Sequence, residues 1–183
     1  MTKEQIEIEG LLLFENKKYV DNRGYFFENF NHEKFEAATG HPVRFVQDNI
    51  SRSGKGVLRG LHLQAPPYDQ GKLVSVLKGK VLDVAVDIRK NSPTYGQHFA
   101  VELSEENGLQ FWIPSGFAHG FVALEENTLF CYKCTSYYHP AAEMSILWND
   151  HDLDINWGIQ HPIVSEKDEN STLFADFNSP FTL

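Results

Sequence analysis

Short apolar or alternating segments follow one another along the chain, and turn residues separate them. They recur about every eight to twelve residues, the spacing expected of a β-sandwich or barrel. Turn signals lie at 91–96, 114–116 and 125–127, and Lys78-Gly79-Lys80 is interpreted as a tight hairpin turn. The pattern predicts strands over 57–63, 72–77, 81–88, 98–103, 109–113, 120–124 and 129–136.

One helix is predicted early in the chain. Asn31 is a suitable N-cap and Gly40 a suitable C-terminal stop, with acidic residues between them. The C-terminal third is less regular. Many short strands with one or a few short helices favour an all-β fold, a cupin-like double-sheet jelly-roll barrel. The length of 183 residues fits one domain, 1–183, with a cavity lined by alternate strand residues.

The net charge of the chain limits the kinds of molecule that it is expected to bind. Lys and Arg number 16 and Asp and Glu 25, so the formal net charge is −9. An acidic surface argues against general binding to nucleic acid or to anionic lipid, although one local basic pocket remains compatible with it. No apolar run approaches the roughly 20 residues of a membrane span, and residues 1–5 lack an apolar signal core. We therefore expect a cytoplasmic protein.

The two cysteines, Cys131 and Cys134, form a lone CxxC motif. Such a pair could be a redox centre or half of a zinc site. A second ligand pair is missing nearby, however, and the surrounding segment reads as a strand, where positions three apart face opposite sides. Two packing cysteines are the favoured interpretation.

Two histidines bear on metal chemistry. Metal-binding cupins carry HxH and a carboxylate on one strand and a later PxGxxH. Here PxGxxH ends at His119, but the first motif reads His62-Leu63-Gln64. Lys72 lies near the expected carboxylate, and an ammonium would repel a metal. A metal is therefore disfavoured and no cofactor is expected, so a metal-dependent cupin dioxygenase is the weaker hypothesis.

The same residue types suit acid–base chemistry. Removing a proton beside a ketone needs a base, a cation for the enolate oxygen and an acid that returns the proton. His, Lys and Tyr meet these needs at neutral pH. Taken singly, His62 is more often a hydrogen-bonded structural histidine and Tyr132 a core tyrosine, so residue type alone does not decide.

From residue 12 to residue 168, the chain resembles the dTDP-4-dehydrorhamnose 3,5-epimerases, metal-independent cupins that act on nucleotide sugars. Ordered blocks at family spacing carry the resemblance: DNRGYFFE (21–28), FVQDN (45–49), VLRGLH (57–62), QGKLV (70–74), DVAVDIR (83–89), SPTYG (92–96), WIPSGFAHGF (112–121), YK (132–133), YY (137–138), LWND (147–150) and SEKD (165–168). The tail after Asp168 matches no family block.

The resemblance implies catalytic roles for four residues. His62 matches the family's base, and Asp168 matches the carboxylate that orients it. Lys72 matches the residue beside the sugar's C4 oxygen. Tyr132 matches the acid that delivers a proton from the opposite face. Together they imply inversion of C3 and C5 in a nucleoside-diphosphate 4-keto-6-deoxy sugar, most simply dTDP-4-dehydro-6-deoxyglucose.

The resemblance also implies substrate contacts and a homodimer, in which the segment from Arg23 to Glu28 completes the partner's pocket. Arg23 and Arg59 match ligands of the pyrophosphate, for which guanidinium groups are suited. The remaining substrate-binding matches are Glu28, Gln47, Asp48, Asn49, His119, Tyr138, Glu143 and Lys167.

Strand parity raises one structural question. On a regular strand Arg59 and His62 face opposite sides, so a shared pocket requires a bulge, which Gly60 would permit, or an arginine that reaches around the edge. Two functional alternatives also remain open: an epimerase of one centre only, and a sugar-nucleotide binding or regulatory cupin without activity.

Overall fold

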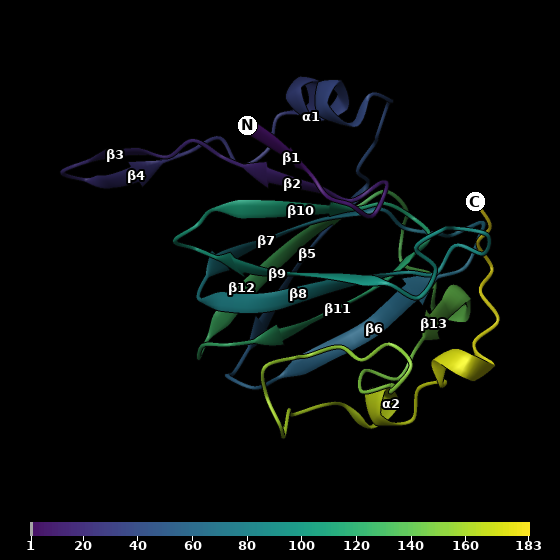
Figure 1. Cartoon of the computed structure of the whole chain (residues 1–183). Coiled ribbons are helices and arrows are strands. Elements are labelled where there is room, and N and C mark those ends of the chain that lie inside the picture. Colours follow the sequence, from purple (N-terminus) through teal and green to yellow (C-terminus); the bar gives the residue numbers. More distant parts are fainter. Residues whose placement is uncertain (1) are drawn as a thin grey trace.

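Two antiparallel sheets face each other across a shared interior (Figure 1). The computed structural model describes residues 2–183. The six-stranded sheet has the order β1 (Thr2–Gln5), β2 (Leu12–Glu15), β10 (Leu109–Ile113), β7 (Lys72–Lys78), β12 (Thr128–Cys134) and β5 (Gln47–Ser53). The five-stranded sheet has the order β13 (Glu143–Ser145), β6 (Leu58–Gln64), β11 (Phe117–Ala123), β8 (Lys80–Asp87) and β9 (His98–Ser104).

This arrangement confirms the predicted all-β, cupin-like jelly-roll barrel. Each of the seven predicted strands overlaps one of the strands from β6 to β12. The strands β1 to β5 and β13 were not predicted. Most of these are three or four residues long, and β5 is largely polar, so none offers a strong apolar alternation.

The predicted hairpin at 78–80 is wrong. Strand β7 pairs with β10 and β12, whereas β8 pairs with β9 and β11, so the turn carries the chain from one sheet to the other. Gly79 has φ 78°, and a Cβ there would lie 2.6 Å from Oγ1 of Thr128. The tight turn is real, but its local sequence does not encode which sheet the next strand joins.

The predicted helix is confirmed as α1 (His32–Thr39). The Asn31 side chain accepts a hydrogen bond from the backbone N–H of Lys34, and Gly40 ends the helix at φ 78°. Its buried Phe35 packs on the outer face of the six-stranded sheet, against Trp112. Among residues 2–183, no helix combines the length and apolar character needed to cross a bilayer.

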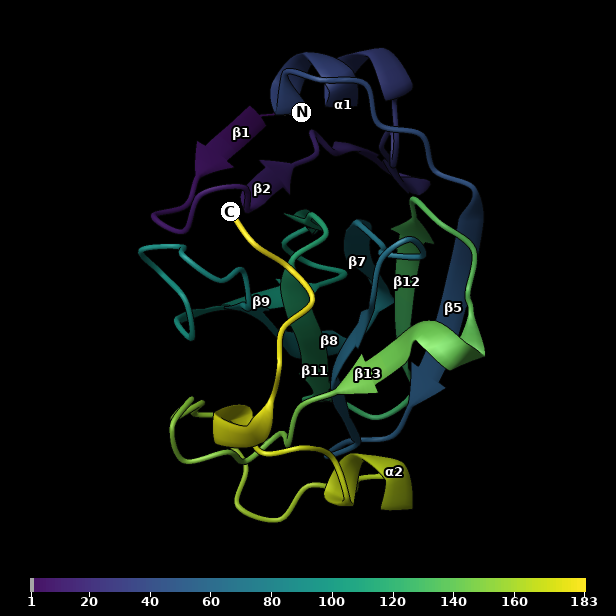
Figure 2. The same cartoon turned by 90° about the vertical axis from the view of Figure 1, so that its right-hand side faces the viewer.

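Two further apolar clusters determine where the cavity lies. One fills part of the barrel interior with residues of both sheets, including Val74, Phe111 and Phe130. The other lies on the outer face of the five-stranded sheet and includes Trp157 and Phe177 of the C-terminal segment. Figure 2 shows the course of this segment around the sheet. Strand β11 is therefore buried on both faces, and the C-terminal segment forms a wall beside the open part of the interior.

The C-terminal segment carries three short helical turns. They are η1 (Pro140–Ala142), α2 (Glu166–Glu169) and η2 (Phe174–Asp176). Ser165 caps α2 by accepting a hydrogen bond from the backbone N–H of Asp168, whose side chain is thereby held against β6. A hairpin of β3 (Tyr19–Asp21) and β4 (Gly24–Phe26) projects from the body of the molecule (Figure 1).

The parity question at β6 is answered by a bulge. Between the pairs His119–His62 and Phe121–Arg59, β11 advances two residues and β6 advances three. Gly60 lies at this irregularity with φ 146°, and a Cβ there would be 2.5 Å from the Cα of Gly120. The extra residue turns Arg59 and His62 to the same side, as the sequence required.

Candidate active site

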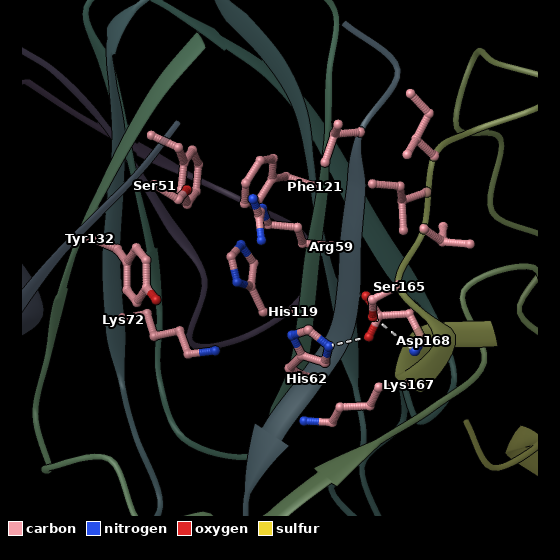
Figure 3. A pocket seen from close by; sticks show the side chains of 15 residues that line it. Ser51, Arg59, His62, Lys72, His119, Phe121, Tyr132, Ser165, Lys167 and Asp168 are labelled. Carbon is pink, nitrogen blue, oxygen red and sulfur yellow. Dashed lines mark hydrogen bonds and ion pairs between the residues drawn. The ribbon is translucent and has the colours of Figure 1, made fainter. Parts of the chain in front are cut away.

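A cavity of about 440 Å³ lies between the two sheets and the C-terminal segment. It adjoins a second cavity of about 380 Å³, and three residues line both: His62, Lys72 and Tyr132. Figure 3 shows these side chains converging from different strands. Phe121 and Phe130 belong to the wall that the interior apolar cluster provides.

His62 and Asp168 form a close pair at the edge of the first cavity. Nε2 of His62 lies 2.6 Å from Oδ1 of Asp168, and the side chains are 29% and 4% exposed. A carboxylate at Nε2 favours the proton on that nitrogen, leaving the lone pair on Nδ1. Nδ1 has no hydrogen-bond partner among residues 2–183, and it faces the cavity (Figure 3).

The charge of Asp168 is maintained by its partners. Burial acts to raise the pKa of Asp168, but hydrogen bonds from His62, Ser165 and the backbone of Gly60 outweigh it, so the pKa lies below its ordinary value. The carboxylate is therefore ionised at neutral pH, and it can stabilise an imidazolium on His62.

Lys72 and Tyr132 approach the cavity from the six-stranded sheet, opposite His62 (Figure 3). The ammonium of Lys72 has no ion-pair partner within the described chain. Burial lowers the pKa of Lys72, while the charges of Cys134, Asp83 and Glu143 act in the other direction. Burial raises the pKa of Tyr132, so its phenol keeps its proton at neutral pH.

A second histidine–carboxylate pair lies behind the first. Nε2 of His119 is 3.0 Å from both carboxylate oxygens of Asp83, and both residues are buried. Burial lowers the pKa of His119, with Asp83 acting against this. His119 lies between Lys72 and Arg59 in the cavity wall (Figure 3), where it can contact a bound molecule.

The second cavity is lined by amide and aromatic groups. Gln47 and Asn49 alternate along β5 and point inward. The Tyr138 hydroxyl donates to Oε2 of Glu143 at 2.9 Å, and Nζ of Lys167 lies 2.6 Å from the same oxygen. Burial acts to raise the pKa of Glu143, but these two contacts outweigh it and hold the pKa below its ordinary value.

Arg59 supplies a second cationic group to the first cavity. Its Nε donates to Oγ of Ser53 at 3.2 Å, and its side chain lines the cavity together with Phe121 (Figure 3). Ser51 lines the same cavity from β5, and its buried hydroxyl has no hydrogen-bond partner within residues 2–183. Guanidinium and hydroxyl groups are suitable ligands for phosphate oxygens.

Three of the predicted binding residues line neither cavity of this chain. Asp48 faces the outer side of β5 and pairs with Lys133 at 2.9 Å, because consecutive strand residues point to opposite faces. Arg23 lies in the projecting hairpin, bonded to Asp21. Glu28 pairs with Lys34 beside α1. The other predicted residues line one or both cavities.

Among the cavity residues that the sequence did not assign to the site are Ser51, Gln64, Gln70 and Phe121. Ser51 follows Gln47 and Asn49 with a period of two, so recognition of β5 as a strand would have identified it and excluded Asp48. Gln64 was noted only as a missing metal ligand. Gln70 and Phe121 lie within family blocks but carry no charge that would single them out.

The cavities do not assemble the ligand set of a metal-binding cupin. His62 and His119 are each bonded to a carboxylate, and the Gln64 amide is bonded to backbone groups. Within residues 2–183, the one converging group of three potential ligand side chains is Asp150, His151 and Asp152, which lines neither cavity. The donors present suit proton transfer.

Both cysteines are free thiols on β12, as the strand interpretation expected. Cys134 is buried and accepts a weak hydrogen bond from Asn49 at 3.6 Å, while Cys131 is partly exposed. Burial raises the pKa of both thiols, which favours the unreactive protonated form.

Known proteins resemble this chain over nearly its whole length. The family model described as dTDP-4-dehydrorhamnose 3,5-epimerase matches residues 5–176. A dTDP-4-dehydrorhamnose 3,5-epimerase of Shigella flexneri is 53% identical over 170 residues, covering 93% of this chain and 94% of the relative.

Solved structures agree with the sequence matches. The crystal structure of dTDP-4-dehydrorhamnose 3,5-epimerase from Elizabethkingia anophelis NUHP1 has a TM-score of 0.93 at 50% identity and covers 98% of this chain and 99% of its own. The dTDP-6-deoxy-D-glucose-3,5-epimerase from Legionella pneumophila Philadelphia 1, in complex with dTDP-4-keto-L-rhamnose, has a TM-score of 0.93 at 50% identity, covering 97% and 94%.

Proposed function

The chain belongs to the dTDP-4-dehydrorhamnose 3,5-epimerase family, and we propose that it carries out the family's reaction in the paired cavities, with His62 as the base and Tyr132 as the acid. The protein is an isomerase that inverts C3 and C5 of a dTDP-linked 4-keto-6-deoxy sugar. Residues 1–183 act as a single epimerase domain.

One carbonyl serves both inversions, because C3 and C5 both flank the C4 ketone. Nδ1 of His62 takes a proton from one of these carbons, and the C–H electron pair moves into the enolate. Lys72 donates to the developing C4 oxyanion, and Asp168 stabilises the imidazolium. Both charges that form in this step therefore lie beside a group of opposite sign.

Inversion requires that the new proton arrive on the other face of the sugar. Tyr132 stands on the opposing sheet and donates its phenolic proton to the carbanionic carbon, as the enolate collapses back to the ketone. His62 then holds the removed proton and Tyr132 is a phenolate, so exchange with solvent resets both groups. Each inverted carbon consequently receives a hydrogen of solvent origin.

The residues that line the two cavities suggest which parts of the substrate bind where. Arg59 binds the diphosphate, and His119 contacts the sugar. In the second cavity, the nucleotide end is surrounded by Gln47, Asn49, Tyr138 and Glu143. Lys167, which lines the first cavity, pairs with Glu143. The proposal is supported most by one observation: His62, with its free Nδ1, faces Tyr132 across a cavity into which Lys72 projects an unpaired ammonium (Figure 3).

The test incubates the protein with dTDP-4-dehydro-6-deoxyglucose in heavy water and follows the sugar protons by NMR. Deuterium at both C3 and C5, with rhamno-configured product, is expected. Deuterium at one carbon would make the protein a single-centre epimerase. Tight binding without exchange would indicate a binding protein, and activity that depends on stoichiometric iron would indicate a metal enzyme.

The homodimer is part of the same proposal. The β3–β4 hairpin projects from the barrel (Figure 1), and it exposes apolar side chains that include Val20, 77% exposed, and Phe26, 70% exposed. Strand β5 forms the edge of the six-stranded sheet. A second copy that covers the hairpin would bury this surface and bring Arg23 and Glu28 to its own cavity.

Complementation between two inactive variants tests the shared site. Arg23→Ala and His62→Ala chains are co-expressed with different tags, and the mixed dimer is purified. If Arg23 serves the partner's cavity, one of the two cavities in that dimer is complete, and activity returns to about half of the wild-type level. A mixed dimer as inactive as its parents, or a monomeric wild-type protein, would contradict the shared site.

A further inference from the structure

Gln64 lies at the position where a metal-binding cupin would carry a metal ligand, but its side chain forms hydrogen bonds with backbone groups. The residue is 5% exposed. Nε2 donates to the backbone carbonyl oxygens of Tyr68 and Tyr137 at 2.6 and 3.3 Å. Oε1 accepts from the backbone N–H of His139 at 2.7 Å. Both amide hydrogens and the amide oxygen are therefore committed to the protein itself.

The bonds of Gln64 join two segments that have no strand or helix of their own. One is the loop 65–70, which contains Pro66 and Pro67, and the other is the segment 135–139 that follows β12. The rings of Tyr68 and His139 stack at 3.8 Å across this junction. Backbone hydrogen bonds hold the second segment at its ends, where Thr135 donates to Gly71 and His139 accepts from Ala142. Between these ends side-chain amides supply hydrogen bonds, including one from Gln70 to the Ser136 carbonyl at 2.7 Å.

The second segment carries Tyr138, which contributes to the wall of the second cavity. Its side chain is 53% exposed, so core packing does not define where it stands. Its backbone N–H donates to Gln47, and its hydroxyl donates to Glu143. Gln64 holds the residues on both sides of it, Tyr137 and His139. The position of Tyr138 thus depends on bonds that Gln64 makes to its neighbours.

The geometry points to Gln64 as a positioning residue that sets the place of Tyr138 and thereby the affinity for the nucleotide end of the substrate. This inference rests on the proposed function, in which Tyr138 contacts the nucleotide. Gln64 acts before the chemistry, because its polar atoms are saturated by backbone groups and do not reach the sugar. Its loss is expected to weaken nucleotide binding and raise KM while kcat changes little.

The test titrates dTDP into wild type and four variants by calorimetry. Gln64→Met keeps the side-chain length and removes every hydrogen bond, whereas Gln64→Glu keeps the acceptor and replaces two donors by a carboxylate. Tyr138→Ala reports whether that residue contacts dTDP. Thr128→Val is the matched control, because it removes a buried side-chain bond to the backbone of Glu125 at 2.9 Å from a residue that lines neither cavity.

Gln64→Met and Gln64→Glu are expected to bind dTDP about tenfold more weakly, the equivalent of one or two buried hydrogen bonds. Deuterium exchange at saturating substrate should stay within about threefold of wild type, since the His62 side is untouched. Thr128→Val should lower Tm and leave the dTDP affinity unchanged. The glutamate variant keeps the test decisive if the methionine variant fails to fold.

The experiment distinguishes a failure of the inference on Gln64 from a failure of the Tyr138 assignment. If Tyr138→Ala weakens dTDP binding but both Gln64 variants bind like wild type with only a lower Tm, Gln64 is merely structural and the inference is overturned. If Tyr138→Ala binds dTDP like wild type, the assignment of Tyr138 to the nucleotide is wrong, and the proposed function loses that contact before Gln64 is considered.

Discussion

Two buried aspartates, each paired with a cationic or basic partner, show how the molecule separates stability from chemistry. Asp87, at the end of β8, accepts hydrogen bonds from Arg89, Ser92 and Thr94, all between 2.6 and 3.0 Å. Arg89 also donates to the carbonyl of Glu9 at 2.9 Å and lies over the Phe117 ring. Asp87 and Arg89 therefore direct their hydrogen bonds to other groups of the protein.

The pair of Asp168 and His62 is built differently. Asp168 is nearly as buried as Asp87, but its partner spends only one ring nitrogen on it and faces the other nitrogen to the cavity. The Asp87 pair, in which protein groups occupy the polar atoms, stabilises the fold. The Asp168–His62 pair leaves Nδ1 of His62 free to bind or deprotonate a substrate in the cavity. Substitutions in the two pairs should therefore affect activity and stability differently.

Replacement of His62 by alanine removes the base and should lower the epimerisation rate by about 10²–10⁴-fold. The Asp168 carboxylate loses one hydrogen bond but keeps those from Ser165 and the backbone of Gly60, so Tm should fall less than in Asp87→Asn. Rates come from the NMR assay and stability from thermal unfolding. A variant that keeps the wild-type rate rejects His62 as the base, and a large loss of stability would place it with the structural pair.

Replacement of Asp168 by asparagine removes the charge that fixes the His62 tautomer, and activity should fall by about 10²-fold. The asparagine can present its amide oxygen to Nε2 of His62, so binding of dTDP should persist. Steady-state rates and dTDP titration measure the two effects. Loss of dTDP binding with an unchanged rate at saturation would contradict an orienting role.

Replacement of Asp87 by asparagine should do the reverse. It leaves the Arg89 guanidinium, 12% exposed, without its carboxylate, which should lower the free energy of unfolding by about 3 kcal/mol. Activity per folded molecule should stay at the wild-type level, because Asp87 lines neither cavity. Urea unfolding followed by assay below the transition checks both, and a specific loss of activity would break the comparison.

The pH dependence of stability gives the same pair a second test. Burial acts to raise the pKa of Asp87, but the bonds from Arg89, Ser92 and Thr94 lower it to about 2. The folded-state pKa is below the unfolded value of 3.8, so this stabilisation is complete above pH 4 and is lost as pH falls toward 2. It amounts to roughly 2 kcal/mol, and Asp87→Asn should flatten the acid limb.

The smallest effect concerns the alkaline limb of activity. Burial lowers the pKa of Lys72, and the charge of Asp83 opposes this. The ammonium is the useful form, so activity should decline with rising pH before an ordinary lysine would titrate. Asp83→Asn removes a charge that favours the ammonium, so the alkaline limb should move to lower pH. A shift to higher pH would contradict Lys72 as the enolate cation.

How much the sequence predicts depends on whether the signal is local. The apolar alternation of β6 to β12 predicts those strands, and the Asn31 and Gly40 caps predict α1. The turn at 78–80 was recognisable from the sequence. The sheet that β8 joins depends on its pairing with β9 and β11, which the turn residues do not encode. The outward orientation of Asp48 was not predicted, because the polar strand β5 carries no apolar pattern that shows which residues face inward.

The site shows the same division. The bulge at Gly60 follows from requiring Arg59 and His62 in one pocket, and β6 has it. Contacts made across the fold could not be derived from the sequence: the Asp168 side chain reaches His62 over 106 positions, and Gln64 reaches His139 over 75. Arg23 and Glu28 line neither of the two cavities, so their predicted contact with substrate depends on the proposed dimer.

The most direct test of the two-faced mechanism is the Tyr132→Phe variant in heavy water. Removal of the phenol takes away the proton that arrives on the second face, while His62, Asp168 and Lys72 still form the enolate. The variant is expected to exchange a sugar proton for deuterium at one centre without forming the inverted product. Full inversion at C3 and C5 at the wild-type rate would contradict the mechanism.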